Sequence, residues 1–337
     1  MTGAGVTGDA GTGAAMTGGA MTDAVMSSKI TIAVITHDRR EEVRRTLRHC
    51  SDLAERPEVI VVDNASRDGT AAMIRREFPQ VTLIESRRNL GAVARNLAVR
   101  RVTTPYVAFC DDDTWWEPGS LASCVAALDE NPDVAAVTAR IIVEPGGRED
   151  PVVDELANSP LPGRGGMPGL MSFLAGASAM RVSAFRACGG FSPRLWLGGE
   201  EELLAADLIT AGHVLCYLPS ATVHHWPSRA RDPRRRRWLG IRNTLWFTWL
   251  RRPSGAALRR TAELARTVPR DLTSVSAFAA ACAGLPWVLR SRRPVPRRVE
   301  EMIRALDEPR RESRPAATSG SVRHAGCPSC FQASSEG

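Results

Sequence analysis

The sequence predicts an α/β fold, in which a doubly wound and mostly parallel sheet is followed by a C-terminal helical extension. Two observations support this prediction. In the first third of the 337-residue chain, short apolar runs alternate with amphipathic helical segments over short connections. One run, 107–110, ends directly in the carboxylates of Asp111, Asp112 and Asp113. Because ligands bind at the carboxyl ends of parallel strands, these residues mark a candidate site.

The elements of this pattern follow one another from Lys29. Strands are predicted where aliphatic and β-branched residues run together, and helices where apolar residues recur every three or four positions. Turn residues separate them, as in 66–70, where Ser-Arg-Asp-Gly-Thr also begins a helix. The predicted strands are 30–35, 59–62, 81–84 and 106–110, and the predicted helices between them are 40–53, 70–78 and 91–102.

The pattern is less regular after the fourth predicted strand. Segment 144–169 is rich in Pro and Gly and predicts a loop over the site, whereas 213–218 predicts a strand that ends before His224 and His225. From Arg229 onward arginine, tryptophan and leucine dominate, which favours amphipathic helices. The predicted divisions are a disordered tail 1–28, an α/β domain 29–228, a basic, Trp-containing helical extension 229–307 and a disordered tail 308–337.

Composition narrows the class of protein only slightly. The formal charge is +7, and Lys29 is the only lysine, so nearly all of the positive charge comes from arginine. An arginine bias of this kind makes the net positive charge weak evidence for any binding partner. Most of the eight cysteines lie in apolar segments, as reduced core cysteines of cytosolic proteins do. Cys327 and Cys330 have C-x-x-C spacing without a second ligand pair and stay unassigned. We expect no signal peptide, because residues 1–28 have no basic n-region and no apolar core. We expect no transmembrane helix, because no uncharged apolar run reaches about 18 residues.

Three adjacent carboxylates at the end of a buried strand repel one another and resist transfer from water. A divalent cation that carries a phosphate-bearing substrate would offset the charge of Asp111 to Asp113, and a solvated acidic turn is the alternative. Two further polar clusters, 36–39 and 63–64, follow other predicted strands. All three clusters should therefore meet at one edge of the sheet, which favours a binding site.

Six short motifs appear in order along the chain. They are Ile32-Ala-Val-Ile-Thr-His-Asp-Arg39, Val61-Val-Asp-Asn-Ala-Ser-Arg-Asp-Gly-Thr70, Asn89-Leu-Gly91 with Arg95-Asn96, Asp111-Asp-Asp113, Gly198-Gly-Glu-Glu-Glu202 and Val223-His-His225. Together they resemble the family 2 glycosyltransferases with the GT-A fold, over about 29–228. The resemblance implies transfer of a sugar from a nucleotide-diphosphate-sugar donor to an acceptor hydroxyl, with inversion and with Mn²⁺ or Mg²⁺. Leu203 departs from the family pattern, where a second acid is frequent.

The resemblance also implies roles for individual residues. Glu201 matches the general base of the family, although acids at a helix N-terminus are common without catalysis. His224 matches a histidine that approaches the metal or the diphosphate, and an ordinary polar strand end is the alternative. The expected donor-binding residues are Thr36, Asp38, Arg39, Asp63, Asn64, Asn89, Arg95, Asp111 and Asp112; the expected metal ligands are Asp113, Asp111 and His224; and the expected acceptor-binding residues are Trp196, Gly199 and Glu200.

Two other functions stay open from the sequence. A sugar nucleotidyltransferase can share this type of fold, but it needs a Gly-rich phosphate loop after the first strand, and 36–40 contains no glycine. A non-catalytic nucleic-acid-binding protein would use the Arg-rich segment 229–311, which lacks a known reading motif and would leave the carboxylate cluster without a role. We therefore expect no nucleic acid partner.

The Arg- and Trp-rich segment bears on where the protein acts. This segment combines clustered positive charge with bulky aromatics, as helices on anionic membranes do. The residues are Arg234 to Arg237, Trp238, Trp246, Trp249, Arg251 and Arg252. Packing of these tryptophans against the α/β domain is the alternative. The resemblance implies a glycan, lipid-linked sugar or small molecule as acceptor, as in cell-envelope or glycoconjugate synthesis. The expected location is the cytoplasm, with a peripheral position on the inner face of the cell membrane.

Overall fold

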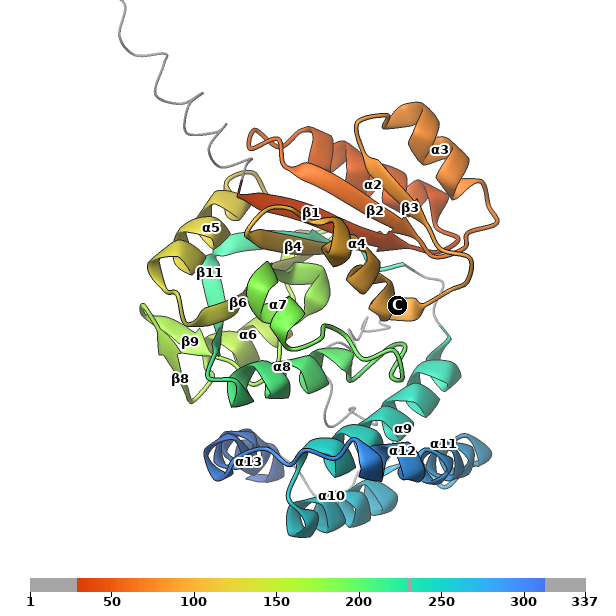
Figure 1. Ribbon diagram of the computed structural model, residues 1–337, viewed down its shortest axis with the longest axis vertical. Coiled ribbons are helices and arrows are strands. Elements are labelled where there is room, and N and C mark those ends of the chain that lie inside the picture. The colour runs from red at the N-terminus through yellow and green to blue at the C-terminus, as the bar shows by residue number, and fades with distance from the viewer. Residues whose placement is uncertain (1–28, 229–231, 313–337) are drawn as a thin grey trace, which may run out of the picture.

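The computed structural model describes residues 29–228 and 232–312, which form an α/β domain with a helical layer on one side of it (Figure 1). The predicted tail 1–28, residues 313–337 of the second predicted tail, and the pair Cys327 and Cys330 lie outside the described residues. The last helix, α13 (Arg297–Glu312), extends past the boundary that the sequence predicts at 307.

One sheet with mixed strand directions forms the centre of the α/β domain. Its first half is the predicted parallel unit, and its strands are mostly buried because helices cover them. The order in this half is β3 (Thr82–Glu85), β2 (Glu58–Asp63), β1 (Ile30–Thr36) and β4 (Tyr106–Asp111). The order continues through β10 (Ser178–Arg181), β6 (Val134–Val143), β11 (Val214–His225), β9 (Met167–Gly169) and β8 (Leu161–Arg164).

One strand in the middle of this sheet runs against its neighbours. The short strand β10 is antiparallel to both of its neighbours, β4 and β6, whereas β6 and β11 are parallel to each other. The sheet is therefore parallel from β3 to β4 and mixed beyond it, which confirms the predicted fold class.

The helices that alternate with the first strands confirm the predicted pattern. They are α2 (Arg40–Ser51), α3 (Thr70–Glu77) and α4 (Arg95–Arg101). The third of them is preceded by a 3₁₀ turn, η1 (Gly91–Ala94), where a helix was predicted from residue 91. Gly91 has φ of 63°, and a Cβ there would lie 2.2 Å from the carbonyl oxygen of Trp196. Only glycine allows this approach, which joins the start of the helix to the segment before Glu200.

Two segments differ from their predictions. The predicted loop 144–169 contains β7 (Arg148–Glu149), α6 (Val152–Ala157) and the β8–β9 hairpin, where Gly163 lies against the backbone of Met167. The strand predicted at 213–218 continues through a register shift to His225 and pairs there with β5 (Thr114–Trp116). The two histidines therefore lie inside a paired strand next to the three aspartates.

The helical extension begins with α9 (Pro233–Arg251), which packs against α8 (Glu200–Thr210) of the α/β domain. Arg251 donates to both carboxylate oxygens of Asp207 in α8, at 2.6 and 2.8 Å. Around α9 lie α10 (Ser254–Thr267), α11 (Leu272–Ala283) and α12 (Leu285–Arg290). No helix in the described ranges has the length and apolar character needed to cross a membrane.

Candidate active site

A cavity of about 330 Å³ opens where the carboxyl ends of β1, β2 and β4 face the N-terminus of α8 and one side of α9. Three of the predicted site residues do not line it: Asp38, Asp63 and His224. The predicted site residues that do line it are Thr36, Arg39, Asn64, Asn89, Arg95, Asp111, Asp112, Asp113, Trp196, Gly199, Glu200 and Glu201. The fold thus brings together residues that are up to 165 positions apart, from Thr36 to Glu201.

The loops after β1 and β2 are held together by two aspartates outside the cavity lining. Asp38 is exposed, has φ of 49° and accepts the Arg67 N–H at 2.6 Å. Asp63 is buried and accepts the Ser66 N–H at 3.0 Å. In this structure both carboxylates therefore fix the loops that border the cavity, and their contact with a donor stays a prediction.

Asn64 connects the end of β2 to the segment before α4. Its side-chain NH₂ donates to the Gly91 carbonyl at 3.0 Å, and its Oδ1 accepts the Leu90 N–H at 3.1 Å. The buried Asn64 side chain thereby places Asn89 on the cavity wall and leads the chain into α4, which carries Arg95.

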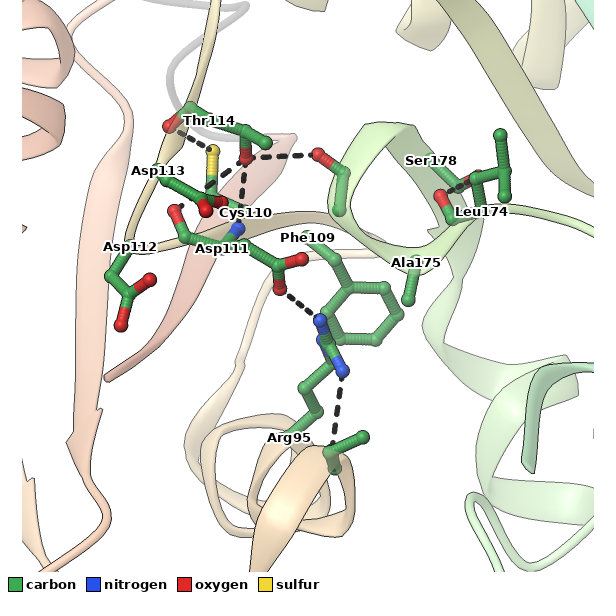
Figure 2. Close-up of polar contacts among 12 residues, drawn as sticks. Arg95, Phe109, Cys110, Asp111, Asp112, Asp113, Thr114, Leu174, Ala175 and Ser178 are labelled. Atoms are coloured by element: carbon green, nitrogen blue, oxygen red, sulfur yellow. Dashed lines mark hydrogen bonds and ion pairs between the residues drawn. The ribbon is translucent and has the colours of Figure 1, made fainter. Parts of the chain in front are cut away.

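A tight turn at the end of β4 presents the three aspartates to the cavity. Thr114 Oγ1 accepts the Asp111 N–H at 2.9 Å, as Figure 2 shows. It also donates to the Gly176 carbonyl at 3.1 Å. Thr46 of α2 donates to the backbone carbonyl oxygen of Asp112 at 2.8 Å from the other side. The Asp111 side chain points toward Arg95, whereas that of Asp112 points away from it (Figure 2). The turn therefore spreads its carboxylates in different directions.

Two arginines lie against these three carboxylates. Arg95, which is buried, forms an ion pair with Asp111 and lies over the rings of Phe109 and Phe191. Arg39 Nη1 lies 2.8 Å from Asp112 Oδ1 and 3.3 Å from Asp113 Oδ2.

Carboxylates thus outnumber the arginines that pair with them, three to two. Burial raises the pKa of Asp112 to about 7, against the opposing effect of Arg39. A further cation beside the turn would favour the charged form of Asp112 and would offset the charge that the two arginines leave unpaired.

The two adjacent histidines of β11 lie on opposite faces of the strand. His224 stacks on Trp115, with ring centroids 5.5 Å apart, and its Nδ1 lies 3.0 Å from Glu144 Oε1. His225 lines the cavity, and its Nε2 lies 3.9 Å from Asp113 Oδ1. The structure therefore brings His225, rather than the predicted His224, to the aspartates. Side chains alternate along a strand, so the sequence contained the signal once both histidines are placed within one.

The residues present fit a metal ion that the substrate helps to bind. In residues 29–228 and 232–312, no group of three His, Cys, Asp or Glu side chains is spaced to hold a metal by itself. Small hard cations are often held by one or two carboxylates together with substrate phosphates, and the adjacent carboxylates at 111–113 suit that mode. Asp113 and Asp111 would then be the protein ligands, with His225 beside Asp113.

Glu200 and Glu201 begin α8 on the opposite side of the cavity. Both side chains are buried, after Gly198 and Gly199, which have φ of 82° each. Glu201 Oε1 accepts the Ala175 N–H at 2.6 Å. Burial, together with the neighbouring charge of Glu200, raises the pKa of Glu201 to about 8. A carboxylate with this proton affinity, facing a cavity, is suited to accept a proton near neutral pH.

The side of α9 that faces the cavity carries residues for which the sequence predicted no site role. Arg236, Leu239 and Asn243 line the cavity, and Arg235 lies over the ring of Trp196 at 4.4 Å. No local motif marks these positions, because they reach the cavity only through the packing of α9 on α8.

Most of the predicted basic segment is engaged within the protein. Arg237 is paired with Asp271, Trp246 is buried and donates to the Ala281 carbonyl at 3.0 Å, and Trp249 donates to Thr261 at 3.1 Å. Arg252 lies 2.9 Å from Glu300. The packing alternative therefore describes these residues.

Comparison with protein families and curated proteins points to one activity class. Residues 31–189 match the model of "Glycosyl transferase family 2". The N-acetylglucosaminyl-diphospho-decaprenol L-rhamnosyltransferase of Mycobacterium tuberculosis is 27% identical over 245 residues, which cover 60% of this chain and 78% of that protein.

Solved structures share the fold at lower sequence identity. The mannosyltransferase PcManGT from Pyrobaculum calidifontis, in complex with GDP-Man and Mn²⁺, superposes with a TM-score of 0.53 at 20% identity over 87% of this chain and 76% of that chain. GalNAc-T7 with UDP, GalNAc and Mn²⁺ has a TM-score of 0.53 at 14% identity, over 67% of this chain and 48% of that chain. This chain thus spans about half the length of GalNAc-T7. These likenesses confirm the GT-A fold.

Proposed function

We propose that this glycosyltransferase, in which residues 31–189 match the family 2 model, is an inverting and metal-dependent enzyme with Glu201 as general base. One observation carries this proposal. The buried Glu201 carboxylate, with its raised pKa, lines the same cavity as the three aspartates and the two arginines that pair with them. One wall of the cavity could bind a cation and a diphosphate, and the opposite wall holds a group that can accept a proton. This arrangement suits transfer of a sugar from a nucleotide-sugar.

The donor would lie along the strand ends. Thr36, Arg39, Asn64 and Asn89 line the part of the cavity nearest β1 and β2, which suits the base and ribose of a nucleotide. The diphosphate would face Arg95 and the 111–113 turn, because a guanidinium pairs with phosphate oxygens in a bidentate way. When bound, a divalent cation at Asp113 and Asp111 would supply charge against the developing negative charge of the leaving diphosphate.

The chemical step follows from the position of Glu201. The acceptor hydroxyl oxygen forms a bond to the anomeric carbon while the bond from that carbon to the diphosphate oxygen breaks. Glu201 accepts the hydroxyl proton, and the electron pair of the broken bond leaves with the nucleoside diphosphate. Attack from the face opposite the leaving group inverts the anomeric centre. The buried site keeps Glu201 a stronger base than a carboxylate in water.

The acceptor would enter beside α9, past Trp196, Gly199 and Glu200. An open groove of about 530 Å³ is lined by Arg234, Arg235 and Trp238, and Arg235 lies over the ring of Trp196, which lines the cavity. Leu272 and Val275 form its apolar side and are 88% and 64% exposed. Neither arginine forms an ion pair with a described carboxylate. Apolar side chains beside unpaired arginines suit an anionic lipid-diphosphate.

We therefore propose a lipid-linked sugar of cell-envelope synthesis as acceptor, and a peripheral position on the cytoplasmic face of an anionic membrane. The relative from Mycobacterium tuberculosis supports this proposal, since its name describes a diphospho-decaprenol-linked substrate. The groove then holds the lipid next to the diphosphate, while the sugar hydroxyl reaches Glu201.

The test is a panel of UDP-, GDP- and dTDP-sugars in thermal-shift measurements with Mn²⁺. A donor that binds the folded protein raises its melting temperature by mass action. The best donor is then incubated with an N-acetylglucosaminyl-diphospho-prenol, and the product is analysed for its anomeric configuration with and without EDTA. We expect a product of inverted configuration that EDTA abolishes. A retained configuration, or turnover that EDTA does not change, would contradict the proposal.

A further inference from the structure

We propose that Asn243 and Arg242 of α9 form a clamp that positions the Glu201 carboxylate for catalysis, so that the helical extension is part of the catalytic unit. The clamp acts on the segment 195–199, which leads directly into Glu200 and Glu201. The proposal rests on the role of Glu201 as base under the proposed function.

The segment 195–199 has an unusual backbone that needs external contacts to keep its shape. Trp196 has φ of 64°, and Gly198 and Gly199 have φ of 82° each. A left-handed conformation is uncommon for a tryptophan and persists where the surroundings enforce it. Because this segment precedes α8 without a spacer, its conformation decides where Glu201 enters the cavity.

Asn243 supplies the contacts from the extension. Its side-chain NH₂ lies within hydrogen-bond distance of three backbone carbonyl oxygens, those of Leu195 at 2.9 Å, Leu197 at 3.0 Å and Gly198 at 2.6 Å. The Asn243 side chain is 1% exposed, so water cannot replace these bonds. A Cβ on Gly199 would lie 3.4 Å from the Cβ of Asn243, which shows how closely helix and segment pack.

Arg242 fixes the orientation of the Asn243 amide. Its Nε donates to Asn243 Oδ1 at 2.9 Å, which leaves the NH₂ end toward the three carbonyls, and its Nη2 lies 3.3 Å from the Leu195 carbonyl oxygen. The guanidinium lies between two tryptophans, 4.8 Å from the ring of Trp238 and 4.3 Å from that of Trp246. Arg242 has no carboxylate partner among the described residues, so its hydrogen bonds serve this segment.

The same segment also contacts the donor wall, the side of the cavity formed by the strand ends, Asn89 to Arg95 and the 111–113 turn. The Trp196 carbonyl accepts the Ala92 N–H at 2.8 Å, and Trp196 Nε1 donates to the Asn89 carbonyl at 3.2 Å. Asn89 and Ala92 line the cavity next to Arg95. The clamp therefore holds a segment that joins the donor wall to the base, and a loosened clamp would displace both relative to each other.

The first experiment measures the contact itself. Amide hydrogen exchange of residues 195–202 is compared in the wild-type protein, in Asn243→Ala and in Thr261→Val. The Thr261 variant removes two side-chain hydrogen bonds within the extension, those with Trp249 and with the Ala257 carbonyl, without touching the segment. We expect exchange to become roughly tenfold faster in Asn243→Ala, for a local opening that is easier by about 1.4 kcal/mol, and to stay unchanged in Thr261→Val.

The second experiment is a double-mutant cycle on kcat, with the donor and the prenyl-diphosphate acceptor that the wild-type protein uses best. We expect Asn243→Ala to lower kcat at least about tenfold in the wild-type background, and less than about twofold in a Glu201→Gln background. The effects of two substitutions are not additive when one residue acts through the other. A general loss of structure would instead lower kcat by the same factor in both backgrounds. Arg242→Lys, which keeps the charge but loses the Nε donor, should show an intermediate effect.

The outcomes separate the clamp from the proposed function. Additive effects in the cycle, or unchanged exchange of 195–202 in Asn243→Ala, overturn the clamp while Glu201 stays the base. A wild-type kcat in Glu201→Gln overturns both the base and the catalytic role of the clamp. A thermal-shift measurement on each variant shows whether a lower rate reflects unfolding.

Discussion

The carboxylates on the two opposite walls of the cavity have different neighbours. On the donor wall, Asp111, Asp112 and Asp113 lie against the guanidinium groups of Arg95 and Arg39. On the opposite wall, Glu201 receives only a backbone N–H, that of Ala175, and lies next to the like charge of Glu200. Burial raises the pKa on both walls, that of Asp112 to about 7 and that of Glu201 to about 8. The strongest charge effect differs, because Arg39 lowers the pKa of Asp112 whereas Glu200 raises that of Glu201.

This difference matches two chemical tasks. Carboxylates that help to bind a cation and a diphosphate work as fixed negative charges, so paired arginines suit them. A general base must take up a proton, so a raised pKa suits it. The comparison therefore predicts that changes on the two walls alter different measurable quantities.

The largest effect is expected from Glu201→Gln. The variant cannot accept the hydroxyl proton, so kcat should fall on the order of 10²-fold or more, while donor binding stays close to normal. The checks are steady-state kinetics and donor-induced thermal shift. Glu200→Gln is the matched control at the neighbouring position. If Glu200→Gln loses activity and Glu201→Gln keeps it, the base is Glu200.

On the donor wall, Asp113→Asn keeps the size of the side chain but removes its charge. Turnover should fall on the order of 10²-fold, because electrostatic stabilisation of the leaving group is lost, and the fold should be retained. Unlike Glu201→Gln, this change should also abolish the increase in thermal shift that Mn²⁺ adds to the donor. Wild-type turnover in Asp113→Asn would show that the cation is held elsewhere.

The ion pair between Arg252 and Glu300 tests the extension separately from the cavity. Their side chains are 7% and 4% exposed and 2.9 Å apart. Glu300→Gln leaves a buried arginine less well paired, and we expect the free energy of unfolding to fall by about 3–5 kcal/mol. The exposed pair Arg297 and Glu301 is the control, since Glu301→Gln should change stability by less than about 1 kcal/mol. If Glu300→Gln lowers donor affinity but not the melting temperature, the prediction that this pair stabilises the extension and does not act on the cavity is wrong.

The raised pKa of Glu201 also predicts a pH dependence of stability. Between its ordinary value of 4.5 and about 8, the folded protein keeps a proton on Glu201 that the unfolded chain has lost. The contribution of Glu201 to stability is therefore full below the unfolded pKa and falls as the pH rises through about 8. Glu201→Gln should then be more stable than wild type at about pH 9, on the order of 1–3 kcal/mol, and similar at about pH 5. Urea unfolding without donor or metal measures the free energy of unfolding of both proteins at each pH. If the two proteins differ by the same amount at both pH values, the prediction is wrong.

The smallest effect concerns the groove beside α9. Replacing Arg234 and Arg235 by Gln should weaken binding to anionic liposomes by about 1 kcal/mol per arginine, with little change in melting temperature. Co-sedimentation with the liposomes measures the binding. Arg297→Gln, which removes a charge from a different and 93% exposed position, is the control. Wild-type protein that stays in solution with such liposomes at low salt would refute the membrane contact.

The sequence alone determined the parallel half of the sheet and most of the donor wall. The strands β1, β2, β3 and β4 follow from local hydrophobic periodicity, and parallel strand ends share one edge, so the motifs at 36–39, 63–64 and 111–113 had to meet. Glu201 was also within reach of the sequence, because its motif is contiguous.

Only the tertiary structure decided the wall formed by the extension and the choice between the histidines. Arg242 and Asn243 reach the 195–199 segment because α9 packs on α8, and nothing in the local pattern of 233–251 encodes that contact. His225 rather than His224 faces Asp113 because β11 continues through a register shift and pairs with β5. Periodicity reports how a segment buries its own side chains, whereas which distant segment they contact depends on the packing of the whole chain.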